Sequence, residues 1–360
     1  MPSRRSSRPQ RRSGGVAAPL AIGVLVIGFG AIALQGDLPA KISSWFASGA
    51  EGELALAPAP RQSSAPSAAA PAQPLPMAQM QSAIASTSDT VNAATWPALP
   101  PQALLDQAAS LGDRALKDTE FDRPPWQRFA RPAAPIAGRT VVAILVTGLG
   151  KDRSVTAAAI AGLPAEVSLS FDPYAPDLAD WIAAARAFGH EAMLDLPMQG
   201  KDFPARDPGP LGLLVGLNDG EMARRIDAVA TGGPDALGFA TADGDAFLMD
   251  DHATATMLGE VARLGLGFVD ASDQTMSLSP ALSTPAGVAS ARAAVRLDSA
   301  DSRGAVAERL AVAAQTAIEH GSVLAVAPAS PTAIVGIADW ARQQSADGPA
   351  LVPVSALLQK

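Results

Sequence analysis

The chain has 360 residues, of which 48% are hydrophobic and 17% are charged, so it is too apolar to be a wholly disordered protein. It contains no cysteine, which excludes a disulfide scaffold, a thiol nucleophile and every cysteine-bound metal centre. The net charge of −8 argues against a partner made of nucleic acid.

The N-terminus has the pattern of a membrane anchor. Residues 1–15 hold five arginines, and residues 16–34 form an uncharged run that would span about 28 Å as a helix, close to the thickness of a bilayer core. Because arginines stay on the cytoplasmic side, we expect one transmembrane helix in a bacterial inner membrane, with the C-terminal domain in the periplasm. Ala31 and Ala33 leave open the alternative of a cleaved signal peptide.

Residues 35–124 are dominated by alanine, proline, serine and glutamine, which predicts a disordered linker. Spaced leucines over Gln102–Leu116 predict one short helix within it. Trp126 and Phe129 follow in a proline-flanked segment. We expect this aromatic segment to dock on the domain that follows, which we place at residues 125–360.

From Arg139 onward, short apolar runs alternate with alanine-rich helical stretches, the pattern of βα units in a parallel sheet. The fold class is therefore α/β, and we predict a distorted (β/α) barrel of seven or eight parallel strands, with a doubly wound sheet as the alternative. A tight turn is expected at 146–151, a helix start at Ser330 and a helix end at Gly321. The strands are expected at 140–146, 167–171, 192–196, 237–241, 267–270, 294–298, 323–327 and 351–354.

Aspartates follow most of these strands, at the end of the barrel where functional groups gather. Helix capping is the simpler explanation for each one alone. Asp195 and Asp270 resist that explanation best because each directly ends an apolar strand, so we name them as candidate catalytic residues. The other aspartates near strand ends are Asp172, Asp243, Asp245, Asp273 and Asp298.

The three histidines are placed poorly for a metal site. His190 and His320 precede strands, at the end of the barrel that usually serves stability, and His252 begins a helix. We therefore predict no metal and no cofactor. Carboxylates alone would favour Mg²⁺ or Ca²⁺ over zinc.

Several motifs in order resemble one family. The strings 171–177 (Phe-Asp-Pro-Tyr-Ala-Pro-Asp), 189–191 (Gly-His-Glu) and 194–198 (Leu-Asp-Leu-Pro-Met) resemble the divergent polysaccharide deacetylases, a branch of the NodB-like carbohydrate esterases. The likeness continues through 207–210, 267–270 and 351–357, and covers about residues 125–360. It implies a distorted (β/α) barrel that acts on or binds a cell-envelope polysaccharide or peptidoglycan-type glycan. Asp172, Tyr174, Asp243 and Asp245 are the candidate substrate-binding residues.

The resemblance also implies a divalent metal held by an aspartate and two histidines, and this chain departs from that pattern. Thr147-Gly148 replaces an aspartate pair, Asp195 stands at a histidine position, and Ala327-Pro328-Ala329 replaces a histidine motif. The strand-four motif has become 240–244 (Ala-Thr-Ala-Asp-Gly). We therefore expect a membrane-tethered pseudoenzyme that binds glycan, with the deacetylase chemistry lost or altered.

Two alternatives remain. One is a metal-independent or Mg²⁺/Ca²⁺-assisted carbohydrate hydrolase in which Asp195 and Asp270 act as an acid/base pair, which requires carboxyl groups about 5–10 Å apart. The other is a structural partner of an envelope complex that makes its contact through the segment around Trp126.

Overall fold

The computed structural model describes residues 100–111, 122–132, 138–241, 243–273, 275–297, 302–345 and 348–360, all within the compact unit Leu75–Lys360. The predicted basic tail, the apolar segment 16–34 and most of the linker lie outside these ranges, as does Asp298. Among the helices of the described ranges, none has both the length and the apolar character needed to cross a membrane. The anchor at 16–34 therefore stays a prediction.

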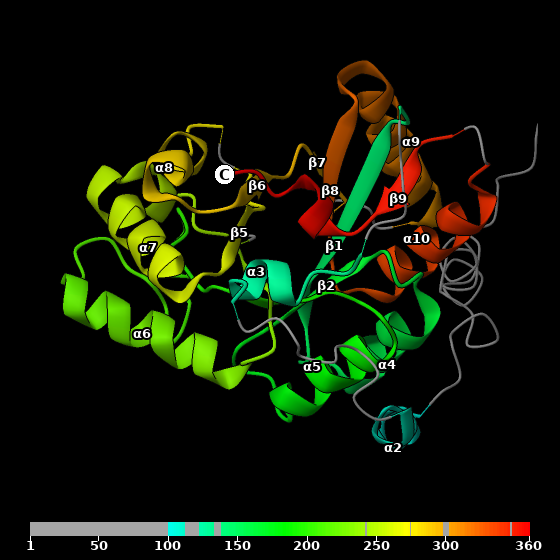
Figure 1. Cartoon of the computed structure of the whole chain (residues 1–360), viewed down its shortest axis with the longest axis horizontal. Helices are drawn as coiled ribbons and strands as arrows, with labels where there is room; N and C mark the ends of the chain where they lie inside the picture. Colours follow the sequence, from blue (N-terminus) through cyan, green and yellow to red (C-terminus); the bar gives the residue numbers. More distant parts are fainter. Residues whose placement is uncertain are drawn as a thin grey trace, which may run out of the picture. The chain divides into compact units, whose positions relative to one another are not determined.

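The strands form one curled sheet in which every strand pair is parallel (Figure 1). The strand order is β6-β5-β4-β3-β2-β1-β8-β7, and β9 pairs with β1 beside this path. The strands are β1 (Val141–Leu149), β2 (Ser168–Phe171), β3 (Ala192–Asp195), β4 (Gly238–Thr241), β5 (Gly267–Asp270), β6 (Ser290–Arg292), β7 (Val295–Arg296), β8 (Ser322–Pro328) and β9 (Ala350–Val352).

The two ends of this strand order are joined by the chain itself. β6 and β7 lie at opposite ends of the order, yet only two residues separate them in sequence. Ala293 donates its backbone N–H to the carbonyl of Asp270 (2.9 Å), and Ala294 donates to the carbonyl of Leu324 (2.9 Å). The segment 290–297 thus pairs with β5 and then with β8, which is consistent with a distorted (β/α) barrel and not with an open doubly wound sheet.

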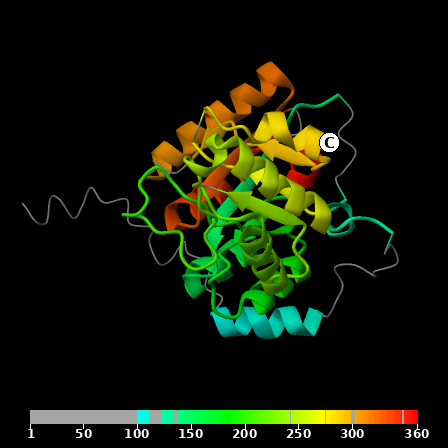
Figure 2. The same cartoon turned by 90° about the vertical axis from the view of Figure 1, so that its left-hand side faces the viewer.

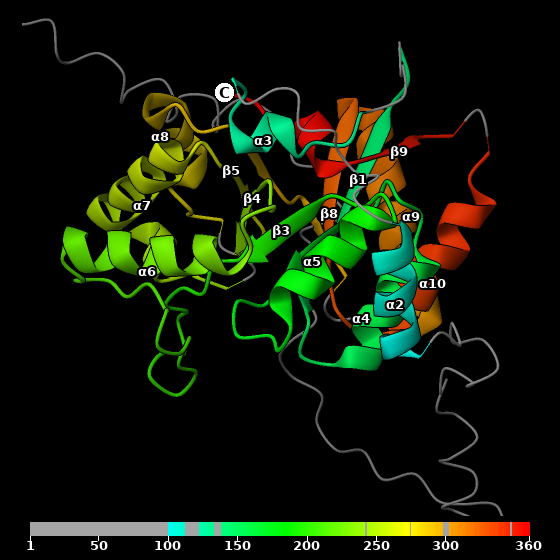
Figure 3. The same ribbon diagram turned by 60° about the horizontal axis from the view of Figure 1, so that its bottom comes forward.

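Helices cover the outside of the sheet. Figure 3 shows α6, α7 and α8 grouped along one side of the strands, and α4, α5, α9 and α10 along the other. Ser330 caps α10 by accepting the N–H of Ala333, and Gly321 ends α9 with a positive φ of 86°, both as predicted. The helices are α2 (Pro101–Leu111), α3 (Pro125–Arg128), α4 (Arg153–Gly162), α5 (Leu178–Ala187), α6 (Asp219–Gly232), α7 (Asp251–Leu264), α8 (Ser279–Ala286), α9 (Arg303–His320) and α10 (Pro331–Gln343), with 3₁₀ turns η2 (Phe247–Met249) and η3 (Val354–Leu357).

The alternation of side chains along β1 divides the core into two layers. Val142 and Ile144 pack in the cluster between sheet and helices, whereas Ala143 and Leu145 pack in a second cluster inside the curled sheet. Because both faces of β1 are buried, the strand is apolar throughout instead of alternating with polar residues.

The segment around Trp126 closes the barrel at the amino ends of the strands. Phe129 is buried in the inner cluster, and Trp126 packs against the same cluster and donates its backbone N–H to the carbonyl of Gly265 (3.2 Å). Leu358, near the C-terminus, belongs to the same cluster. The aromatic segment therefore docks on the domain as predicted, and this packing accounts for both rings without a partner protein.

The structure differs from the strand predictions in two places: one strand was missed, and the end of another was placed too early. Ser290–Arg292 was not predicted as a strand, because serine, alanine and arginine carry no β-branched or aromatic signal and all three residues are only half-buried. The tight turn expected at 146–151 begins later, since β1 continues to Leu149 before the turn into α4. The functional end of this strand therefore lies further along the chain than the apolar run suggested.

Candidate functional site

We call the loops that follow β1 to β5, together with the last residues of those strands, the carboxyl face. Asp195 lies at its centre, at the end of β3. Its Oδ1 accepts the hydroxyl of Ser170 on β2 (2.6 Å), and its Oδ2 accepts the backbone N–H of Gly148 on β1 (2.8 Å). The side chain thus bridges three neighbouring strands. Burial raises the pKa of Asp195 to about 6, against the hydrogen bonds that favour its charged form.

Lys151 and Asp172 form an ion pair beside Asp195. The Nζ of Lys151 lies 2.6 Å from Oδ2 of Asp172, whose Oδ1 accepts the backbone N–H of Tyr174 (2.8 Å). Asp172 is buried, whereas 67% of the Lys151 side chain is exposed. The hydrogen bond to Asp172 raises the pKa of Lys151, so the side chain stays an ammonium ion at neutral pH.

Tyr174 joins the loop after β2 to the loop after β3. Its hydroxyl donates to the carbonyl of Pro208 (3.0 Å) and accepts the backbone N–H of Leu211 (2.9 Å). Gly209 has a φ of 88°, and a Cβ there would lie 2.8 Å from the Tyr174 hydroxyl, so the close approach requires glycine. With 40% of Tyr174 exposed, part of the ring is available to a sugar face.

Asp243 and Asp245 follow β4 and face basic side chains from the loop after β3. Lys201 lies 4.0 Å from Asp245, and Arg206 lies 3.9 Å from Asp243. The Oδ1 of Asp245 is buried and has no hydrogen-bond partner within the described residues, and burial raises the pKa of this carboxyl group. We call Asp195, Ser170, Gly148, Lys151 and Asp172 the Asp195 cluster. The structure places Asp243 and Asp245 at the carboxyl face but outside this cluster.

Asp270 is held in a different way from Asp195. It is 1% exposed, its Oδ1 accepts the N–H (3.0 Å) and hydroxyl (2.6 Å) of Ser272, and its Oδ2 accepts the hydroxyl of Ser279 (2.7 Å). Arg292 lies 3.9 Å away. These contacts fix the loop between β5 and α8, so they favour a structural role. An acid/base role for Asp270 with Asp195 stays a prediction.

Replacing Ser279 with alanine tests this structural role. The change removes the hydroxyl donor from a buried carboxylate oxygen, so we expect a loss of about 1–2 kcal/mol in the free energy of unfolding. Urea unfolding of the full chain measures it. Thr284→Ala, at an exposed position of α8, is the control and should change stability by no more than about 0.5 kcal/mol. Equal effects of the two changes would contradict the structural role.

The histidines lie where the sequence predicted them. His190 is buried before β3, with its ring nitrogens 2.8 Å and 3.0 Å from the carbonyl oxygens of Val167 and Ile160. His252 is exposed at the start of α7 beside Asp219, and His320 is exposed at the end of α9. Over the described ranges, no three histidine, aspartate or glutamate side chains are grouped in a way that would hold a metal ion.

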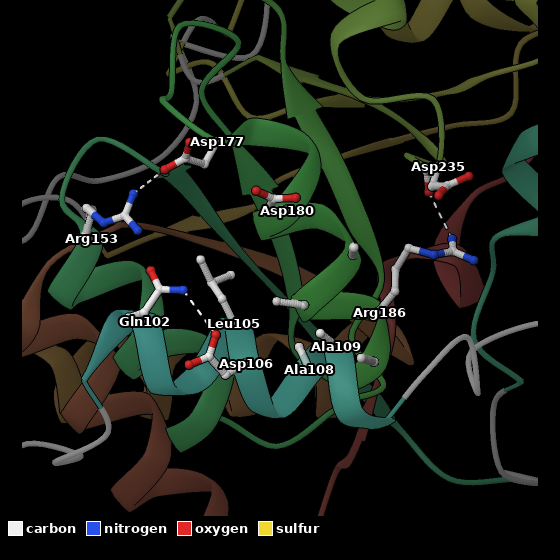
Figure 4. Close-up of a pocket in the computed structure, with 13 residues that line it drawn as sticks. Gln102, Leu105, Asp106, Ala108, Ala109, Arg153, Asp177, Asp180, Arg186 and Asp235 are labelled. Carbon is white, nitrogen blue, oxygen red and sulfur yellow. Dashed lines mark hydrogen bonds and ion pairs between the residues drawn. The ribbon is translucent and has the colours of Figure 1, made fainter.

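A groove of about 660 Å³ lies elsewhere, between α2 and α5 (Figure 4). Figure 2 shows α2 in cyan, lying against the green part of the chain, where Leu104 is its most buried contact. In the groove, Arg153 pairs with Asp177, and Arg186 donates to the carbonyl of Asp235 (2.9 Å). None of the predicted site residues lines it, but Asp177, in the loop after β2, belongs both to the groove and to the carboxyl face.

Two residues of the Asp195 cluster were missed from the sequence. Ser170 sits inside an apolar strand and reads as a tolerated small residue, although strand alternation places it on the same face of the sheet as Asp172. Lys151 was considered only as part of a turn. Its position directly after the first strand was the available signal, since the loops after parallel strands carry the site.

Comparison with known proteins identifies a family and a similar solved structure. The profile of a family described as divergent polysaccharide deacetylase matches residues 144–358. The crystal structure of an uncharacterized protein from Agrobacterium tumefaciens C58 is similar at 30% identity and a TM-score of 0.63, covering 65% of this chain and 95% of that protein. No curated protein matches the chain.

A second solved structure, an HpcH/HpaI aldolase from Desulfitobacterium hafniense DCB-2, covers 59% of this chain and 96% of its own. Its identity is 14% and its TM-score 0.29, so it carries no argument about fold or function.

Proposed function

The chain belongs to the divergent polysaccharide deacetylase family, and from this membership we propose that it binds a cell-envelope polysaccharide at the carboxyl face without metal-dependent deacetylation. We further propose that residues 16–34 hold it in the bacterial inner membrane with the domain in the periplasm. The arginine-rich tail and the apolar run of the sequence support that placement.

The residues of the carboxyl face do not fit the divalent metal that the family resemblance implies. At the end of β1, Thr147 is buried and its hydroxyl points to the carbonyl of Ala327 (3.4 Å). Pro328, at the end of β8, offers no side-chain donor, and both oxygens of Asp195 already accept hydrogen bonds. His190 and His320 lie at the other end of the strands, and His252 is exposed beside Asp219. Within the described residues, no histidines and acidic side chains are grouped in a way that would supply the ligands of such a site.

The arrangement of Lys151, Asp172 and Tyr174 is the observation that carries the binding proposal. A charged donor, a buried carboxylate and a half-exposed aromatic ring lie on two adjacent loops. Protein sites bind sugars through such groups, because hydroxyl and acetamido groups need hydrogen-bond partners while the apolar faces of the ring stack on aromatic side chains.

Binding and chemistry are separated by one experiment on the full-length protein in detergent. We expect saturable binding of acetylated glucosamine oligomers or of peptidoglycan strands, and no release of acetate with or without added Zn²⁺. Calorimetry measures binding, and an enzymatic acetate assay measures turnover. Asp235→Asn, on an exposed residue of the turn before β4 at the other end of the strands, is the matched surface control and should bind as the wild type does.

Acetate release that requires one bound zinc ion per chain would overturn the loss of chemistry. Absence of binding to every acetylated glycan tested would overturn the binding role itself.

A further inference from the structure

The turn after β1 contacts two acidic residues at the carboxyl face. Lys151 follows Gly148 by three residues, and the Gly148 N–H binds Asp195 while the Lys151 ammonium binds Asp172 at 2.6 Å. The backbone N–H of Asp172 also donates to the carbonyl of Leu149 (2.8 Å), which fixes the two loops against each other. The turn after β1 therefore contacts both acidic residues, Asp195 through the Gly148 N–H and Asp172 through the Lys151 ammonium.

Asp172 directly follows β2 and Asp195 ends the adjacent strand β3, one position beyond the paired residues Phe171 and Leu194. Two carboxylates on neighbouring strand ends, partly removed from bulk water, repel each other unless a positive charge lies near them. The charges of Asp172 and Asp195 both act on Lys151, and Lys151 in turn acts on Asp195. A bound divalent ion is the usual alternative in carboxylate sites. Here the positive charge is supplied by the side chain of Lys151.

The ammonium also has capacity left for a ligand. It carries three N–H donors, and the contact with Asp172 uses one of them. Since 67% of the side chain is exposed, the remaining donors reach solvent and anything bound at the carboxyl face.

We propose that the Lys151 ammonium is the built-in cation of the carboxyl face, and that it donates hydrogen bonds to carbonyl or hydroxyl oxygens of an acetamido sugar with no divalent ion present. This inference deepens the proposed function and rests on it. Asp172 positions the ammonium, and Asp195 receives its electrostatic influence. No bond to the sugar is made or broken.

The test uses full-length protein and an acetylated glucosamine pentamer, titrated by calorimetry in EDTA and again with Mg²⁺ or Zn²⁺. We expect the wild-type affinity to be equal under all three conditions. Lys151→Met should weaken binding at least tenfold, whereas Lys151→Arg, which keeps the charge, should stay within about threefold of the wild type. Lys360→Met is the matched control, because Lys360 is exposed at the C-terminus, and it should bind as the wild type does.

A second measurement does not depend on the sugar. Removing the Lys151 charge leaves two carboxylates without their cation, so millimolar Ca²⁺ should raise the melting temperature of Lys151→Met but not that of the wild type. Wild-type binding that needs a divalent ion, or Lys151→Met behaving as the wild type in both assays, would overturn the inference. If the wild type binds no glycan but the calcium response appears only in Lys151→Met, the proposed function fails while the built-in cation stands.

Discussion

Replacing Asp195 with asparagine is expected to stabilise the protein at neutral pH by up to about 3 kcal/mol while weakening glycan binding. The pKa of Asp195 rises from 3.8 to about 6 on folding, so the folded state holds its proton where the unfolded state has lost it. The stability that the protonated Asp195 side chain contributes is fully present below pH 3.8, falls as the pH rises from 3.8 to 6, and is absent above that range. Asparagine never ionises and avoids this loss.

Urea unfolding of the wild type and of Asp195→Asn between pH 3.5 and 8 measures the effect. The two proteins should have similar stability near pH 3.5 and diverge with increasing pH, until the difference becomes constant above about pH 7. Asparagine can still accept the N–H of Gly148 and donate to the hydroxyl of Ser170, so the fold is retained. A difference in the free energy of unfolding that does not vary with pH would contradict the raised pKa of Asp195.

Glycan binding by the same variant supplies the second half of this prediction. A residue kept at a cost in stability is typical of a functional position. Asp235→Asn, the surface control, should change neither stability nor affinity. If Asp195→Asn binds glycan as tightly as the wild type, the binding surface lies away from the Asp195 cluster.

Replacing Glu191 with alanine is expected to destabilise the protein by about 3 kcal/mol. Glu191 is 1% exposed, and its carboxylate accepts hydrogen bonds from four donors in three separate segments. The donors are the backbone N–H of Arg131 (2.9 Å), the hydroxyl of Ser168 (3.0 Å), and both the backbone N–H (3.1 Å) and the hydroxyl of Ser355. The two hydroxyl groups can turn to other acceptors, but the two backbone donors cannot.

The destabilisation caused by Glu191→Ala should be detectable in both segments that bind the carboxylate, around Arg131 and around Ser355. Amide hydrogen exchange at Arg131 and Ser355 is expected to accelerate along with the fall in the free energy of unfolding. The matched control is Glu166→Ala, because the half-exposed Glu166 pairs with the guanidinium of the same Arg131 (3.0 Å), and it should cost less than about 1 kcal/mol. Equal losses in the two variants would contradict the role of Glu191 as the buried connection.

The barrel was predictable because its strands are short apolar runs that end in recognisable breaks. No polar residue occurs within Val323–Ala327, and in Gly267–Asp270 the one polar residue comes at the end. Strands that are buried on both sides of the sheet require such uninterrupted apolar runs. Ser290–Arg292 was not predictable in this way. Its place in the sheet depends on backbone pairing with Phe268 to Asp270, a long-range contact that side-chain pattern does not encode.

The candidate site was predictable as a location and less so as a set of contacts. The rule that parallel strands gather their functional groups at one end predicted that Asp172 and Asp195 share one end of the sheet, and they do lie at the ends of the adjacent strands β2 and β3. It did not distinguish Asp270, whose environment depends on Ser279, nine residues further along the chain. Burial and hydrogen bonding decide whether a carboxylate is available to a ligand, and both are properties of the folded protein.

The Trp126 segment and the C-terminal residues lie beside the start of β5. A Cβ at Gly267, at the start of β5, would lie 2.8 Å from Leu358 and 3.5 Å from Trp126, and Gln359 pairs with Ser290 at the start of β6. The Trp126 segment and the C-terminal residues therefore share the amino end of the barrel, opposite to the end that carries Lys151 and Asp195, whereas α2 packs on α4 and α5. A protein domain fused after Lys360 would therefore lie at the end of the barrel opposite to the proposed ligand.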